Sequence, residues 1–269
     1  MLKIFLNYLT DGLQEIYHAV KDYNLMLALG RQDVATRYRR SRIGAFWLTI
    51  NMIVTIMVLG FVFGGIFKQS INNFLPYLTV GLVLWGFISN SINEGCASFS
   101  SSSDIILQVR MSFFIHIVRV LWRNLIILFH NLLIIPIVFI IFSKSLSIDS
   151  LLSIPALFLI LMNLAWMSLL LAIICTRFRD VGHIVQNIMQ VTFFVTPIFW
   201  EAKLVMGDFV EIINLVNPFY HMINIFRAPL LGLDSDIFSW IFCAIFFLVG
   251  SILSLYFLGK YQKRITYWL

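Results

Sequence analysis

The chain has 269 residues, of which 60% are hydrophobic and only 12% are charged, and its mean hydropathy is +0.92. Soluble domains carry about a quarter charged residues, so this composition excludes an ordinary soluble protein and predicts an integral membrane protein with several spans. The net charge of +6 does not indicate nucleic-acid binding, because the basic residues lie beside the apolar runs. The three cysteines have neither the number nor the spacing of a disulfide framework or a metal site.

Residues 11–30 predict an amphipathic helix at the N-terminal side of the chain. Asp11 and Gln14 have the spacing of a capping box. One apolar stripe at helical spacing contains Leu9, Leu13, Ile16, Val20, Tyr23 and Leu27. Such a helix lies in the plane of the membrane interface and does not cross it. We therefore expect residues 1–43 to form a cytoplasmic segment that carries an interfacial helix.

The stretch RYRRSRIGAFW marks the first entry into the membrane. Its four arginines are Arg37, Arg39, Arg40 and Arg42, and residues 44–67 after them contain no charge. At about 1.5 Å per residue, a helix over this run is long enough to cross a hydrocarbon core of roughly 30 Å. Clusters of Lys and Arg stay on the cytoplasmic side, so the arginines fix the orientation.

Six spans are expected in total, which makes the fold an all-α integral membrane protein. The third run is too long for one straight crossing, and Pro136 is expected to bend it. Residues 201–236 are interrupted by glycines and prolines, and they predict short, half-inserted helices on the outer side. We place the spans at 44–67, 74–95, 113–142, 151–175, 184–200 and 237–259, so that a six-helix domain covers 44–259 and a basic cytoplasmic tail covers 260–269.

The distribution of basic residues supports this layout. Of the 19 Lys and Arg residues, 13 fall in segments expected inside and four in segments expected outside, while Arg119 and Arg123 lie within the third span. This is a strong positive-inside bias, and it predicts that both termini are cytoplasmic.

No motif of an enzyme occurs in the sequence. It lacks the GxxxxGK phosphate loop, HExxH and GxSxG, and its histidines are not at metal-ligand spacing. Polar residues at membrane depth are the remaining candidates for function. Arg119 and Arg123 are four residues apart on one helix face, near Glu94. They either face an aqueous path or extend to the lipid headgroups.

The fifth span is the best candidate for a channel-lining helix. Its amides and rings fall in one stripe, which suits sugars because hydroxyls accept and donate hydrogen bonds and C–H faces stack on rings. Plain packing between helices would explain the same residues. The first span offers polar residues with the same ambiguity. The candidate lining residues are Thr49, Asn51, Thr55, Gln186, Gln190, Phe193, Phe194, Phe199 and Trp200.

Two inside loops have the composition of a docking surface for a soluble partner. The first is FSSSSDIILQVR, in which Asp104 is expected to cap a short helix and Arg110 adds a charge. The second is TRFRDVG, with Arg177, Arg179 and Asp180. The alternative is a pair of solvated turns whose arginines only obey the positive-inside bias.

Taken together, several motifs resemble the permease subunits of ABC transporters that export polysaccharides. They are RYRRSRIGAFW, PYLTVGLVLWGFISNSINE, TRFRD, VTPIFW and NPFYHMINIFRAPLLG, in this order, between about Gln32 and Gly232. That family includes exporters of O-antigens, capsules and teichoic acids. The sequence departs from the family at QVRMSFFIH, which keeps Arg110 but lacks the usual proline.

The resemblance implies a homodimer paired with two copies of an ATPase subunit in the bacterial cytoplasmic (inner) membrane. This chain would bind no cofactor, and ATP with Mg would be used by the partner. The substrate would be a glycan on undecaprenyl diphosphate, in the first place an O-antigen. Its pyrophosphate needs cations near the inner leaflet, and the candidates are Arg37, Arg39, Arg40, Arg42, Arg119 and Arg123.

Other functions stay open from the sequence. A capsular polysaccharide or a teichoic acid is an alternative substrate. An exporter of small amphipathic molecules has the same architecture and does not need polar pore stripes. A membrane-embedded enzyme acting on lipid-linked sugars would need paired carboxylates or histidines at one depth, and Glu94 is the only acid that we place inside a span.

Overall fold

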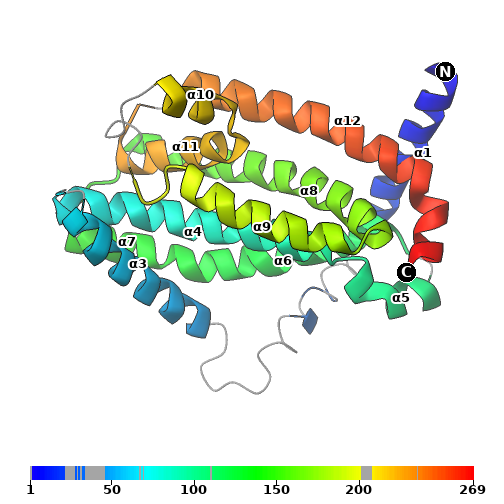
Figure 1. Cartoon of the computed structure of the whole chain (residues 1–269), viewed down its shortest axis with the longest axis horizontal. Helices are drawn as coiled ribbons and strands as arrows, with labels where there is room; N and C mark the ends of the chain where they lie inside the picture. The colour runs from blue at the N-terminus through cyan, green and yellow to red at the C-terminus, as the bar shows by residue number, and fades with distance from the viewer. Residues whose placement is uncertain are drawn as a thin grey trace.

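The computed structural model describes residues 2–21, 28, 30, 32–33, 46–66, 68, 70–109, 111–200, 208–234 and 236–269. Within these ranges the chain forms helices and turns and no strand, which confirms the all-α prediction (Figure 1). The predictions for Arg37, Arg39, Arg40, Arg42 and Arg110 lie outside the described residues.

The elements follow one another in a simple order. The helices are α1 (Leu2–Lys21), α3 (Phe46–Ile66), α4 (Ile71–Cys96), α5 (Ser103–Gln108), α6 (Phe113–Leu132), α7 (Ile134–Ile141), α8 (Ser153–Arg177), α9 (Asp180–Val195), α10 (Asp208–Val216), α11 (Pro218–Leu231) and α12 (Ile237–Trp268). Short 3₁₀ turns, Ser100–Ser102 and Ile148–Leu152, precede α5 and α8.

Five of the six predicted spans correspond to helices that are long and apolar enough to cross a membrane. They cover Phe46–Ile66, Ile71–Cys96, Phe113–Ile141, Ile148–Arg177 and Ile237–Trp268. The remaining one, predicted over 184–200, is α9 with 16 residues. At about 1.5 Å per residue α9 is about 24 Å long, shorter than the roughly 30 Å hydrocarbon core, so the sixth crossing stays a prediction.

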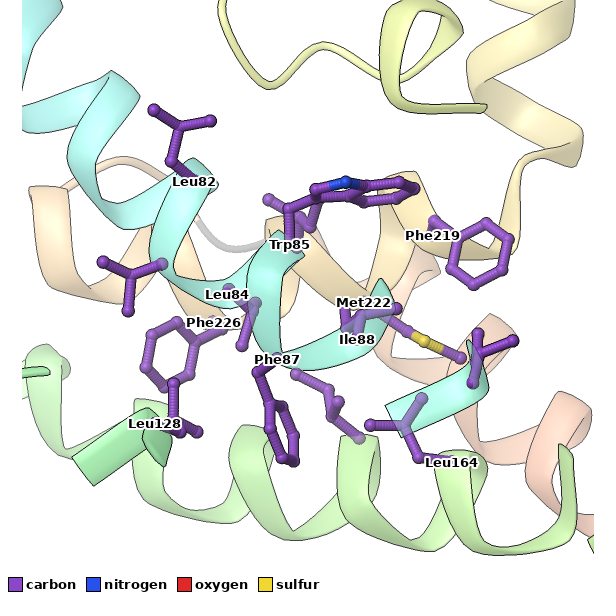
Figure 2. Close-up of a cluster of buried hydrophobic side chains, with 14 of the residues drawn as sticks. Leu82, Leu84, Trp85, Phe87, Ile88, Leu128, Leu164, Phe219, Met222 and Phe226 are labelled. Carbon is purple, nitrogen blue, oxygen red and sulfur yellow. The ribbon is translucent and has the colours of Figure 1, made fainter. Parts of the chain in front are cut away.

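Helix α4 is the centre of the fold. Between Phe74 and Ile88 it is almost entirely apolar, and 72% of its most hydrophobic 18 residues are buried, against 17% for α3. Figure 2 shows Leu84, Phe87 and Ile88 of α4 among Leu128 of α6 and Leu164 of α8, while Trp85 faces Phe219 of α11. A helix with this pattern must be surrounded by other helices, and α4 therefore positions most of the side chains discussed below.

The third span is interrupted, as the sequence predicts. Helix α6 ends at Leu132 and α7 begins at Ile134, two residues before Pro136. Proline has no N–H for the carbonyl of Leu132, four residues earlier, and its ring collides with that carbonyl. The break at Leu133 follows from this.

The N-terminal helix differs from the prediction. Helix α1 begins at Leu2, so Asp11 lies in its middle and the proposed capping box is wrong. Leu13 and Val20 of the expected apolar stripe are exposed, whereas Gly12 and Ala19 are buried. Small residues let α1 approach α12 with backbone against backbone, and the larger apolar side chains consequently face outward.

Residues 208–234 form two short helices, in line with the expectation that this segment does not span. Asn217 separates α10 from α11, and its side chain accepts hydrogen bonds from the amides of Phe219 and Tyr220. Gly232 ends α11 with φ at 65°, in the left-handed region that favours glycine. Burial lowers the pKa of His221, so the ring is neutral near pH 7 and its Nε2–H donates to the carbonyl of Leu215 at 3.0 Å.

Candidate functional site

Aromatic side chains gather at the C-terminal end of α9. The rings of Phe193, Phe194 and Phe199 lie 5.3 to 6.1 Å apart, measured between centroids. Phe63 of α3 lies 4.7 Å from Phe199, and Trp85 of α4 lies 5.8 Å from Phe193. We call this set, with Phe219 at 5.8 Å from Trp85, the aromatic cluster: Phe63, Trp85, Phe193, Phe194, Phe199 and Phe219.

The structure thus brings together three of the four rings that the sequence assigned to this end of the helix. The fourth, Trp200, donates its indole N–H to the carbonyl of Phe194 at 3.2 Å. Phe63, Trp85 and Phe219 were missed, because sequence spacing relates residues only within one helix. They belong to α3, α4 and α11, and their place in the cluster follows from ring contacts between elements far apart in the chain.

A turn over residues 196–200, which we call the outer turn, follows α9 directly. Pro197 disfavours helical geometry at the residue before it, and Thr196 is extended with ψ at 136°. The Asn217 amide donates to the hydroxyl of Thr196 at 2.9 Å, so the outer turn is tied to the start of α11. The ring of Phe199 is 8% exposed, whereas that of Phe194 is 59% exposed.

The predicted polar lining is mostly on the surface of the single chain. Gln186 and Gln190 are exposed, and Met189 is the only buried residue of α9. On α3, Asn51 and Thr55 are exposed, while Thr49 is buried. The hydroxyl of Thr55 donates to the carbonyl of Asn51 at 2.9 Å. The channel-lining role of these residues stays a prediction.

Near the other end of the fold, charged side chains form a network between α4, α6 and the N-terminal segment. Arg119 donates to both carboxylate oxygens of Asp33, at 2.7 and 3.1 Å. Arg123 donates to Glu94 at 2.7 and 3.2 Å and lies 3.8 Å from Asp33. Asn124 adds a bond to Glu94 at 2.7 Å. We call these residues the charge network.

In this conformation both arginines, Arg119 and Arg123, are paired with carboxylates of the same chain. Their guanidinium groups contact carboxylates of the same chain, and their side chains are only 11% and 20% exposed. The two positive and two negative charges balance. Contact with a lipid pyrophosphate stays a prediction for both arginines, and it would require the phosphate to compete with Asp33 and Glu94.

The two predicted docking loops meet at one cavity of about 490 Å³. Ser100 and Ser103 line it from the first loop, and Thr176, Arg179 and Gly182 line it from the second. The sequence placed both loops inside without relating them to each other. The structure shows that they form one surface, at the end of α4 that lies away from the aromatic cluster.

The charged residues of that surface are accessible. Asp104, Arg177, Arg179 and Asp180 are all exposed. The guanidinium of Arg177 lies over the rings of Phe178 and Trp268, at 5.1 and 5.3 Å. Asp104 does not cap α5, because the helix begins at Ser103; the carboxylate instead lies in the first turn, where it complements the helix dipole.

Two comparisons with known proteins bear on the family of this chain. A family model described as "ABC-2 type transporter" matches residues 24–231. The O-antigen export system permease protein RfbA of Myxococcus xanthus is 25% identical over 206 residues, which cover 76% of this chain and 79% of the relative. The family match includes the aromatic cluster, the charge network and both docking loops.

Proposed function

Because the chain belongs to the ABC-2 type transporter family, we propose that its cargo is a polysaccharide linked to undecaprenyl diphosphate, in the first place an O-antigen. The chain is the permease of an ABC exporter. The relative from Myxococcus xanthus is named for O-antigen export, which supports this choice over a capsule or a teichoic acid. The membrane would be the bacterial cytoplasmic membrane, with both termini inside.

The observation that carries the proposal is the combination of rings and amides along α9. A hydrophilic polymer crosses the hydrocarbon only if polar groups and rings replace its water. The exposed amides of Gln186 and Gln190 lead along one helix face to the aromatic cluster. The rings stack on sugars during passage and close on one another at rest, which limits ion leakage.

The assembly that we propose is a homodimer with two ATPase subunits. The chain has no phosphate loop, so ATP and Mg are used by a partner. The surface around the 490 Å³ cavity, with its exposed charges on both docking loops, is the proposed contact with that partner. The exposed face of α9 is the proposed contact with the second copy, since each copy would then contribute one wall of the channel.

The cations for the pyrophosphate are proposed near the inner leaflet. Arg37, Arg39, Arg40 and Arg42 lie there by sequence, next to α3. Arg119 and Arg123 belong to the charge network and would contribute only by exchanging Asp33 and Glu94 for phosphate.

The decisive experiment removes the gene and identifies what accumulates inside the cell. We expect the undecaprenyl-diphosphate-linked glycan on the inner leaflet and its absence from the surface. Restoring the wild-type chain should restore export, and purification of a tagged chain should recover the ATPase.

A second cargo class remains testable in the same strain. If the glycan reaches the surface normally while resistance to small amphipathic compounds falls, the chain is an exporter of small amphipaths and the polysaccharide proposal is wrong.

A further inference from the structure

We propose that Arg227 is a positioning residue that holds the aromatic cluster closed at rest, acting together with Tyr77 through the outer turn. The transport consequence rests on the function proposed above. The structural part concerns only how the outer turn is fixed between α4 and α11, and it has its own measurement.

Arg227 is buried in a way that requires an explanation. It lies in α11 and is 3% exposed. Among the residues that the structure describes, no carboxylate lies within ion-pair distance of it. Taking a guanidinium out of water is costly, so the polar and ring contacts that Arg227 makes help to explain its position.

Two contacts use the guanidinium at once. Its Nη1 donates to the carbonyl of Pro197 at 2.9 Å, and its central carbon lies 3.8 Å from the ring centroid of Tyr77. A planar guanidinium is able to stack on a ring and donate from its edge simultaneously. A lysine in the same place keeps the charge but offers no flat surface and no fixed fork of donors.

Tyr77 secures the same turn from the side of α4. Its hydroxyl lies 3.2 Å from the carbonyl of Pro197 and 3.3 Å from that of Trp200, as a donor shared by both. A Cβ on Gly81 would lie 3.1 Å from the carbonyl of Ile198, so α4 runs close beneath the turn. The outer turn is therefore fixed at its beginning, its middle and its end.

The position of Phe199 depends on the outer turn, because this residue is part of it. This ring contacts Phe63 at 4.7 Å and Phe193 at 5.4 Å, and it joins the cluster residues of α3 and α9. If the carbonyl of Pro197 loses its donors, the turn becomes free to move and takes Phe199 with it. The closure of the cluster then depends on a residue that is not part of the cluster.

The test uses Arg227→Lys and Tyr77→Phe in a chain that lacks the native cysteines and carries Trp200→Cys. The substitution at Trp200 leaves its backbone carbonyl in place for Tyr77. The measurements are the rate at which a membrane-impermeant maleimide labels that cysteine and the ion leak of the resting protein in liposomes. Arg264→Lys, an exposed arginine near the end of α12, is the matched control.

We expect Arg227→Lys to raise the labelling rate about tenfold, as the loss of one charge-assisted hydrogen bond would. Tyr77→Phe should raise it less, and the effect of the double variant should differ from the sum of the two single effects, because both donors share the Pro197 carbonyl. The leak should rise in the same order, while gel filtration remains unchanged.

The outcomes separate the two proposals. Wild-type labelling in Arg227→Lys overturns the positioning role, as does full additivity of the two variants. If labelling rises as expected but alanine variants of Phe193, Phe194 and Phe199 change neither leak nor export, the positioning role holds and the proposed path is the part that fails.

Discussion

At the scale of single residues, Glu94 accepts hydrogen bonds from two donors on α6. The guanidinium of Arg123 and the amide of Asn124 both reach one of its oxygens at 2.7 Å. Glu94→Gln removes the charge and leaves both donors with a weaker acceptor. Hydrogen bonds to charged groups contribute about 1.5–3 kcal/mol, so we expect the midpoint of thermal unfolding in detergent to fall by about 3–10 °C.

The control for Glu94→Gln is Asp149→Asn, an exposed carboxylate before α8. It should leave the midpoint within about a degree of wild type, as surface substitutions usually do. Equal midpoints for the two variants would mean that the charge network does not contribute to stability.

The same network shows what residue spacing predicts and what it does not. Positions 119 and 123 lie on one face of any helix, so their common direction follows from the sequence alone. Asp33 is 86 residues from Arg119 in the chain, and no local pattern relates the two. Arg227 is a similar case, because its contacts with Pro197 and Tyr77 depend on how α4, α11 and the outer turn meet.

At the scale of elements, α1 and α12 cross with their backbones in contact. A Cβ on Gly12 would collide with the backbone carbonyl of Leu255, which does not rotate away as a side chain would. We expect Gly12→Ala to cost about 1–3 kcal/mol by overpacking and to loosen α1. Limited trypsin digestion should then cut faster after Lys21, at the end of α1.

Gly65→Ala on α3 is the matched control for this crossing. Nothing lies within 4 Å of the Cβ that it adds, so digestion after Lys21 should proceed as in wild type. Equal digestion of the Gly12 variant would show that α1 is not held by this crossing.

The limits of α1 illustrate why element boundaries were harder to predict than element type. The first four residues of the predicted stripe, up to Val20, lie in α1, while Tyr23 and Leu27 lie outside the described residues; the buried face of α1 is the one with Gly12 and Ala19. Small residues pack against a neighbour only when that neighbour has room for close approach, and here Gly259 of α12 provides it. The sequence of either helix alone does not show such a match between the two.

The docking loops give the second prediction at this scale. Arg177 and Asp180 are exposed beside the cavity that both loops share, where a partner reaches them. We expect Arg177→Glu or Asp180→Arg to uncouple ATP hydrolysis from export, because reversed charges meet like charges on the partner. The measurement is the ATPase rate of the purified complex together with surface glycan.

Lys144→Glu serves as the control for these variants. Lys144 is half-buried, donates to Asn73 at 2.7 Å, and lies more than 30 residues along the chain from either loop. Its reversal should leave coupling intact. If the Arg177 and Asp180 variants also couple normally, the second loop is only a solvated turn and does not contact the ATPase.

At the scale of the whole molecule, the unusual feature is how little of α9 is covered. Figure 1 shows α9 in front of α4, and Met189 is its only buried residue. Five of the runs that hydropathy predicted as spans are helices long and apolar enough to cross a membrane. It could not define α9, because the helix is short, is ended by Pro197 and carries amides that a lipid-facing surface would not need.

This exposed face leads to a prediction about the dimer. Ile184, Ile188 and Val191 follow one another along α9 and are 54%, 54% and 62% exposed. In a two-fold dimer a residue near the axis meets its own copy, so one substitution provides both cysteines of a cross-link. We expect Ile188→Cys or Val191→Cys, in a chain without native cysteines, to form a disulfide-linked dimer on mild oxidation in membranes.

The control must be similarly exposed but on another helix, and Ile154→Cys of α8 meets this condition at 68% exposure. Cysteines form a disulfide only when their Cα atoms approach to roughly 4.4–6.8 Å, so random encounters in the bilayer should give little product at either site. A cross-link on α9 alone places this helix at the interface between two copies, next to the aromatic cluster of each. Equal cross-linking at Ile154→Cys, or none on α9, would mean that the two copies meet through another face and that the amides of α9 have a different role.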